Sequence, residues 1–246
     1  MCCFSQSVEK VSDTNIFARS SKDGRQYLVY SMTLSAKDDL AMILPIPVPK
    51  HSKEDAVRFI NLEKYADFFK DLVAGFPSRS RGRASLGLGE AAGAKLEVKK
   101  VGSFDASFVP AIKDFKRLDE RFRLPAGVWD KLPMYTDYGF AVFKLRKGAA
   151  QVHPMAFEFP RADPKQLFFP TVHIHDGKVH PKAHFDHALY CQQAEDENLP
   201  ILKWQESVQP AGLFMKVDKA QGVLAKDGHC YLLRLRGNLK NEDTMI

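Results

Sequence analysis

The sequence predicts an α+β fold that is dominated by β-strands, with mostly antiparallel sheets and a few short helices. Short β-branched and aromatic runs alternate with turn residues along most of the chain. Apolar residues at helical spacing are confined to residues 52–73 and to a short stretch at 111–121. Because 45% of the 246 residues are apolar, the chain can bury a large core, and we expect a single domain over residues 1–246.

The expected strands begin near the N-terminus. Residues 15–19 and 26–35 are joined by a turn in which Gly24 supplies a positive φ, which predicts a hairpin. The next run, LAMILPIPVP, has proline at every second position from Pro45, so it loses three backbone donors and is expected at a sheet edge or in an extended loop. Further strands are expected at 97–101, 137–146, 156–159, 212–217, 223–224 and 230–236, and residues 238–246 are expected to fray.

Residues 77–95 are small, polar and glycine-rich, and we interpret them as a mobile surface loop. This segment holds Arg79, Arg81 and Arg83 with no acidic residue among them. Three arginines could bind a phosphate or an anionic partner, but the absence of interleaved aromatic residues favours a solvated loop.

Charge and cysteine content narrow the class of protein. Lys and Arg total 36 against 30 Asp and Glu, a net charge of +6, and both signs are interspersed, which argues against a nucleic-acid partner. No run of about 18 apolar residues and no signal-peptide pattern is present, so we expect a cytoplasmic protein with no membrane partner. Its four cysteines are then expected to be reduced thiols, available for metal or for catalysis.

Several segments together resemble the bacterial family known as domain of unknown function 2330. The matching stretches are CCFSQSVEKVSDTNIFAR, LAMILPIPVP, VGSFDASFVPAIKDFKRLDERFRLP, YTDYGFAVFKLRKG and HPMAFEFP, which span about the first two thirds of the chain. Members of that family are mostly exported proteins with a cysteine-bearing start after a signal peptide, whereas Cys2 here follows the initiator Met directly. The resemblance implies a bacterial protein and supplies no mechanism.

The segment from 169 to 192 is the strongest candidate for chemistry. Five of the eight histidines fall within fifteen positions, where a uniform spread would place about 0.5. They are His173, His175, His180, His184 and His187. This local bias indicates a metal-binding segment, and the alternative is a surface hairpin whose rings are individually solvated.

The spacing of the histidines allows two arrangements. If residues 171–175 are extended, His173 and His175 project from one face. If residues 184–191 are helical, His184, His187 and Cys191 share one face, whereas in a strand His184 and His187 point to opposite faces and only one joins the site. Asp176 and Asp186 could add oxygen ligands or hold an imidazole by hydrogen bonding.

Imidazole ligands suit Zn, Cu and Fe, and a thiolate shifts the preference toward Zn or Cu. The leading hypothesis is therefore a metal-binding protein, with a metalloenzyme favoured, that carries out hydrolytic or oxidative chemistry on a small molecule or peptide. A closed site would instead fit metal storage or sensing without catalysis. The spacing matches no metalloprotease signature such as H-E-x-x-H, so the reaction stays open.

A second hypothesis uses the N-terminus. Removal of the initiator Met would leave Cys2 with both a thiol and an α-amino group, and the amine could serve as the base for the thiol. This arrangement is typical of N-terminal nucleophile amidohydrolases. Alternatively, Cys2 and Cys3 could be soft metal ligands or a terminal pair with no task.

Overall fold

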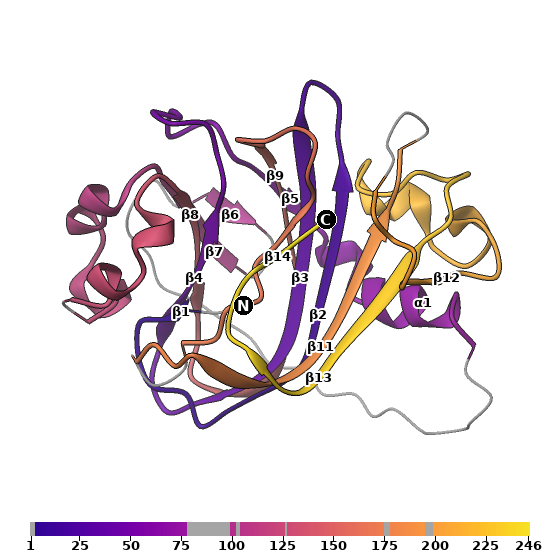
Figure 1. Cartoon of the computed structure of the whole chain (residues 1–246). Helices are drawn as coiled ribbons and strands as arrows, with labels where there is room; N and C mark the ends of the chain where they lie inside the picture. Colours follow the sequence, from indigo (N-terminus) through magenta and orange to yellow (C-terminus); the bar gives the residue numbers. More distant parts are fainter. Residues whose placement is uncertain (1–2, 78–98, 102–103, 126, 175–177, 195–198) are drawn as a thin grey trace.

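Two β-sheets packed face to face form the framework of the computed structural model (Figure 1), which describes residues 3–77, 99–101, 104–125, 127–174, 178–194 and 199–246. The larger sheet has the order β12 (Gln205–Glu206), β13 (Tyr231–Lys240), β11 (Lys182–Gln192), β2 (Lys10–Ser20), β3 (Arg25–Ala36), β9 (Gly148–Pro160) and β5 (Arg58–Asn61). The smaller sheet has the order β1 (Cys3–Phe4), β4 (Leu40–Ile46), β8 (Gly139–Leu145), β7 (Phe104–Val109) and β6 (Lys99–Val101). All pairs in these sheets are antiparallel except β11 with β2, which confirms the predicted fold class.

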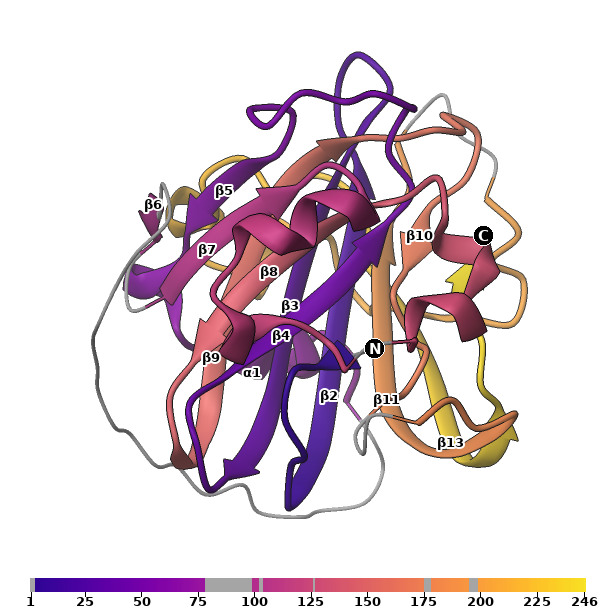
Figure 2. The ribbon, with the colours of Figure 1, turned by 90° about the vertical axis from the view of Figure 1, so that its left-hand side faces the viewer.

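The helical content is small, as predicted. The one α-helix is α1 (Phe68–Ala74) among the described residues, and the 3-10 helices are η1 (Glu63–Tyr65), η2 (Ile112–Arg117), η3 (Glu120–Phe122), η4 (Trp129–Lys131), η5 (Pro133–Tyr135), η6 (Ala211–Leu213) and η7 (Val217–Ala220). Figure 2 shows η2 to η5 over the outer face of the smaller sheet. On the opposite side of the molecule, α1 covers the larger sheet (Figure 1).

The predicted hairpin is present as β2 and β3. Their register runs from Ser20 opposite Gln26 to Lys10 opposite Ser35, and Gly24 in the turn has φ +70°. A β-bulge interrupts the register between Ser12 and Asn15. The bulge lies next to Thr14, where the pairing of β2 with β11 begins, and this position becomes important for the candidate site.

The prediction that LAMILPIPVP lies at a sheet edge or in an extended loop holds only in part: Pro47 and Pro49 follow β4 in a non-regular segment, whereas the run up to Ile46 is not in an edge strand. Strand β4 is second in the smaller sheet, between β1 and β8. Pro45 is tolerated there because β1 is only two residues long and reaches no further than Ile43, whereas Pro45 lies beyond it and pairs only with Phe140 of β8. A short neighbour thus leaves the proline locally at an edge.

Two apolar cores lie on the two faces of the larger sheet. The core between the sheets includes Phe143 and Phe157, whose ring centroids are 5.8 Å apart across the interface. The second core lies under α1, where Phe68 packs edge-on against Phe17 of β2 at 5.6 Å. Full burial of one such side chain contributes about 1.5–3 kcal/mol, so the two cores together fix the larger sheet from both faces.

Several expected elements differ from the structure. Within residues 52–73 the helical stripe is split, because Phe59 belongs to strand β5 and only the part from Glu63 onward is helical. The strands expected at 212–217 and 223–224 are replaced by η6, η7 and turns. The tail at 238–246 was expected to fray, yet it completes β13 and forms β14 (Thr244–Met245), which pairs with β10 (Phe168–Phe169). The loop expected at 77–95 lies outside the described residues from position 78 onward.

Candidate functional site

A cavity of about 520 Å³ lies where β2 and β11 separate. The two strands pair only from His187 opposite Thr14 onward, so the start of β11 continues beside β13 alone. Four of the five clustered histidines line this cavity: His173, His180, His184 and His187. The structure therefore brings most of the predicted histidine cluster to one place.

Residues 182–192 form strand β11, so the helical alternative for 184–191 is wrong and the strand alternative holds. Along this strand Leu189 belongs to the core between the sheets, and Phe185 and His187 are buried on the same face, whereas His184 and Asp186 are exposed. The twofold periodicity of the strand is the reason. His184 and His187 therefore line the same cavity from opposite faces of β11.

The centre of the cavity wall is a pair of imidazoles. Nε2 of His173 lies 3.0 Å from Nε2 of His187, and the two rings are stacked at 15° with centroids 4.7 Å apart. Phe185 lies against both rings, 4.5 Å from that of His173 and 5.1 Å from that of His187. His187 is only 4% exposed, so its ring is held in a largely apolar setting.

The C-terminal residues position His173. The side chain of Asn241 accepts a hydrogen bond from the backbone N–H of His173 at 2.6 Å and donates to the carbonyls of His173 and His180 at 2.9 Å each. Asn241 thus ties together both ends of the segment between these two histidines. The geometry of the imidazole pair depends on residues about seventy positions away in the chain.

Asp243 adds a second clamp on the same segment. Its carboxylate accepts hydrogen bonds from the backbone N–H groups of Thr171 and Val172 at 2.8 and 3.0 Å, and from the hydroxyl of Tyr135 at 2.6 Å. Burial raises the pKa of Asp243 above its usual value, although these donors favour its charged form. The clamp joins the segment of His173 to η5, on the outer face of the smaller sheet.

Of the other predicted site residues that the structure describes, Cys191 is not brought to the pair. Cys2, His175 and Asp176 lie outside the described residues. Cys191 is buried in the core between the sheets, four residues along β11 from His187, which is about 13 Å away in a strand. Within the part of the chain that the structure describes, no three His, Cys, Asp or Glu side chains are grouped to hold a metal ion.

Sequence reasoning missed Asn241 and Asp243. Both lie in the tail that was expected to fray, and nothing in the local pattern marks them as partners of the histidine segment. Hydrogen bonds to backbone groups far away in the sequence order this polar tail, and the local sequence pattern does not reveal such bonds.

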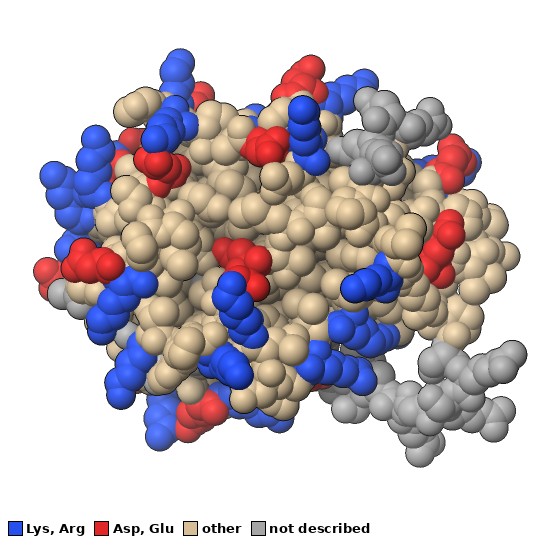
Figure 3. Space-filling view, viewed as in Figure 1, with Lys and Arg blue, Asp and Glu red and all other residues tan. Residues whose placement is uncertain are grey.

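Surface charge is mixed on the face shown in Figure 3, where Lys and Arg side chains are interspersed with Asp and Glu. Among the described residues, no helix has the length and apolar content needed to cross a membrane.

Comparison with known proteins identifies the fold. No family model and no curated protein matches the sequence. The fold is similar to that of baculovirus P35: one crystal structure is 14% identical, covers 96% of each chain and has a TM-score of 0.50. A mutated baculovirus P35 after caspase cleavage is 15% identical, with 95% of this chain and 99% of that chain covered and a TM-score of 0.51. The chain therefore has a P35-like fold over nearly its whole length.

Proposed function

We propose that this chain is a binding protein that engages a protease of the caspase kind, as baculovirus P35 does when it is cleaved. The observation that carries the proposal is the extent of the fold likeness, which covers 95–96% of this chain and 96–99% of the P35 chains. Proteins that share a fold over their whole length can share a kind of partner, and a caspase is the protease that cleaved the P35 chain.

The state of the thiols is in keeping with a binding role. Cys3, Cys191 and Cys230 are all buried. Burial raises the pKa of the Cys230 thiol to about 12, so the thiolate that a nucleophile requires is scarce at neutral pH. These three thiols are therefore suited to packing, and catalysis by cysteine would depend on Cys2.

The test measures both activity of the protease and integrity of the chain. A panel of caspases is incubated with increasing amounts of the folded chain, and hydrolysis of a fluorogenic peptide is followed over time. We expect inhibition of at least one caspase near molar equivalence, with one discrete cut detected by intact mass. The heat-unfolded chain is the control and should be cut without inhibiting. If every caspase keeps full activity at tens of micromolar chain and the chain stays intact, the proposal fails.

We propose metal binding at the imidazole pair as a second function, because one distance favours it. Two nitrogen ligands of a tetrahedral zinc ion, each at 2.0–2.1 Å, are about 3.3 Å apart. The Nε2 atoms of His173 and His187 are 3.0 Å apart, so a small ring rotation would let both bind one ion. Zn or Cu would be preferred by this nitrogen pair, with Fe as a further candidate.

Such an ion would have only two protein ligands among the described residues, so other positions would stay open to water or substrate. An open position is what hydrolytic or oxidative chemistry on a small molecule or peptide requires. A storage or sensing role would need the site to be closed by further ligands. His180 and His184, which also line the cavity, are the available imidazoles.

The metal proposal is tested on protein purified without a histidine tag. We expect binding of about one Zn²⁺ or Cu²⁺ per chain by elemental analysis and calorimetry, and loss of this binding in both His173→Ala and His187→Ala. His51→Ala is the matched control, because His51 is exposed in a distant turn and should leave binding unchanged. Equal metal binding by the wild type and by both variants would refute the proposal.

The thiol amidohydrolase remains a prediction that rests on Cys2 alone. A thiol-reactive amide analogue should then form one covalent adduct, located at Cys2 by peptide mapping and absent in Cys2→Ser. Because Cys3, Cys191 and Cys230 are buried, they should react only after unfolding. A single adduct on the folded chain would therefore indicate reaction at Cys2.

A further inference from the structure

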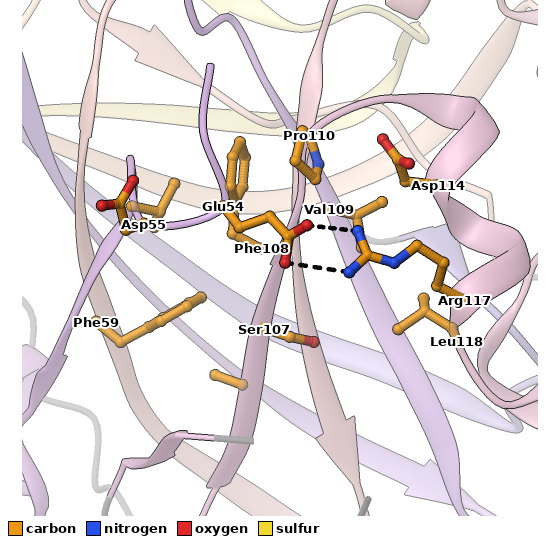
Figure 4. A pocket seen from close by; sticks show the side chains of 12 residues that line it. Glu54, Asp55, Phe59, Ser107, Phe108, Val109, Pro110, Asp114, Arg117 and Leu118 are labelled. Carbon is orange, nitrogen blue, oxygen red and sulfur yellow. Dashed lines mark hydrogen bonds and ion pairs between the residues drawn. The ribbon is translucent and has the colours of Figure 1, made fainter. Parts of the chain in front are cut away.

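A second cavity, of about 500 Å³, lies at the opposite end of the larger sheet from β12 and β13 (Figure 4). One wall comes from the segment that leads into β5, another from β7, and a third from η2. The first wall leads into the larger sheet, β7 belongs to the smaller sheet, and η2 is one of the 3-10 helices over the smaller sheet. The cavity therefore lies at a junction of the two layers, where ligand sites are commonly found.

The floor of this cavity is apolar and held in place by packing. Phe59 is partly exposed toward the cavity, and its ring packs against those of Phe143 at 5.6 Å and Phe157 at 6.1 Å. Val57 and Phe108 are 2% and 8% exposed, so they are fixed by the core beneath them. An apolar side chain placed on this floor would bury further surface without a rearrangement of the protein.

The rim is charged and carries an ion pair. The Arg117 guanidinium donates to both carboxylate oxygens of Glu54, at 2.5 and 3.3 Å, and this pair crosses the centre of the view in Figure 4. Asp55 lies on one side of the pair and Asp114 on the other. Three carboxylates and one guanidinium give the lining a net charge of −2, on a chain whose net charge is +6.

From this combination we propose that the cavity binds a lysine or arginine side chain that a protein partner presents beside an apolar side chain. The apolar residue would lie on the floor near Phe59 and Phe108, and the cation would lie at the rim near Asp55 or Asp114. Side chains at positions i and i+2 of an extended peptide point to the same side and are about 6–7 Å apart, so a short segment can satisfy both parts at once. The inference does not depend on whether that partner is a protease.

Arg117 acts as an internal competitor in this site. Its guanidinium already neutralises Glu54, and the hydrogen bonds and charge of Arg117 hold the pKa of the Glu54 carboxyl below its usual value. A ligand cation would pair with Asp55 or Asp114, the carboxylates that Arg117 does not bind. If Arg117 were removed, the cation could pair with Glu54 as well. We therefore expect that replacing Arg117, a basic residue of the protein, strengthens binding of the cationic peptide.

The test is an NMR titration of the ¹⁵N-labelled full chain with the capped peptide acetyl-Ala-Leu-Ala-Arg-Ala-amide. The matched peptides replace Arg by Gln, Arg by Glu, or Leu by Ala. We expect shifts at the backbone amides of Phe59, Phe108 and Arg117, and weaker binding by each matched peptide, with the glutamate peptide weakest.

Variants of the protein separate this site from general charge effects. Asp55→Asn with Asp114→Asn should weaken binding of the arginine peptide about fivefold, since an exposed ion pair changes an affinity by at most about fivefold. Arg117→Gln should strengthen it about two- to fivefold by the same reasoning. Asp218→Asn with Asp227→Asn makes the same change in net charge away from the cavity and should leave binding unchanged.

Four results would overturn the inference, three with the peptides and variants and one with a small amine. The glutamate peptide could bind as tightly as the arginine peptide, Arg117→Gln could weaken binding, or the shifts could fall outside the cavity lining. Phenylethylamine is included as a free small cation. Tighter binding of this amine than of the peptide would show that the cavity takes a small molecule instead of a partner's side chain.

Discussion

Asn241→Ala is the sharpest single perturbation of the histidine site. The substitution removes three hydrogen bonds: one from the His173 N–H, one to the His173 carbonyl and one to the His180 carbonyl. A hydrogen bond contributes a net 0.5–1.5 kcal/mol, and the bond to His180 counts least because that residue is exposed. We therefore expect the free energy of unfolding to fall by about 2 kcal/mol, mainly from the two bonds to His173.

Three measurements check this value. Urea unfolding should give the loss of about 2 kcal/mol directly, and calorimetry should show a Tm lower by about 4–8 °C for a chain of this length. Hydrogen exchange of the His173 amide should accelerate about 30-fold at the least, since its acceptor is lost. Metal binding at the imidazole pair, where present, should weaken because His173 is no longer held toward His187.

Asn238→Ala is the matched control. Asn238 is exposed on β13, three residues before Asn241, and its cross-strand partner is His184, which is itself exposed. Its replacement should change the free energy of unfolding by less than about 0.5 kcal/mol. If Asn241→Ala and Asn238→Ala are equally mild, the C-terminal clamp does not order the histidine segment, and the reasoning from these contacts is refuted.

Three further predictions concern the rest of the molecule. Glu158→Gln should destabilise the chain by about 1–2 kcal/mol at pH 7, because this carboxylate is one-tenth exposed and is bound by Ser21, Arg58 and Arg25. Burial opposes ionisation, but the Ser21 and Arg58 hydrogen bonds and the two arginine charges hold the Glu158 pKa below its usual value. Its stabilisation is thus complete above the unfolded pKa and lost as pH falls through the folded pKa, so urea unfolding at pH 3 should show a smaller deficit than at pH 7; an equal deficit would contradict this. Gly139→Ala would place Cβ 2.5 Å from the Phe108 ring, and we expect a loss of about 1–3 kcal/mol by denaturation and weaker binding of the arginine peptide as the ring is pushed toward the second cavity. The Cys230 thiol, with a pKa of about 12, should resist iodoacetamide at pH 8 in the folded chain and react in urea; rapid reaction without denaturant would show that its burial is wrong.

The strand framework could be predicted from the sequence because it depends on local signals. The β2–β3 hairpin follows from alternating apolar residues around a turn with Gly24, and both properties are set by neighbouring residues. The histidine cluster is likewise visible as a compositional bias, and four of its five members do line one cavity. What local pattern left open was whether residues 184–191 form a helix or a strand, since a short apolar run fits both.

The tertiary structure alone decided which of those histidines meet. His173 and His187 are brought together because β11 pairs with β2 and β13 and because Asn241 and Asp243 hold the segment around His173 from the other end of the chain. The cavity between β5, β7 and η2 arose in the same way, from residues more than fifty positions apart such as Glu54 and Arg117. Composition and periodicity determined the strands and the candidate chemistry, whereas contacts between distant segments, which local spacing does not encode, decided the sites.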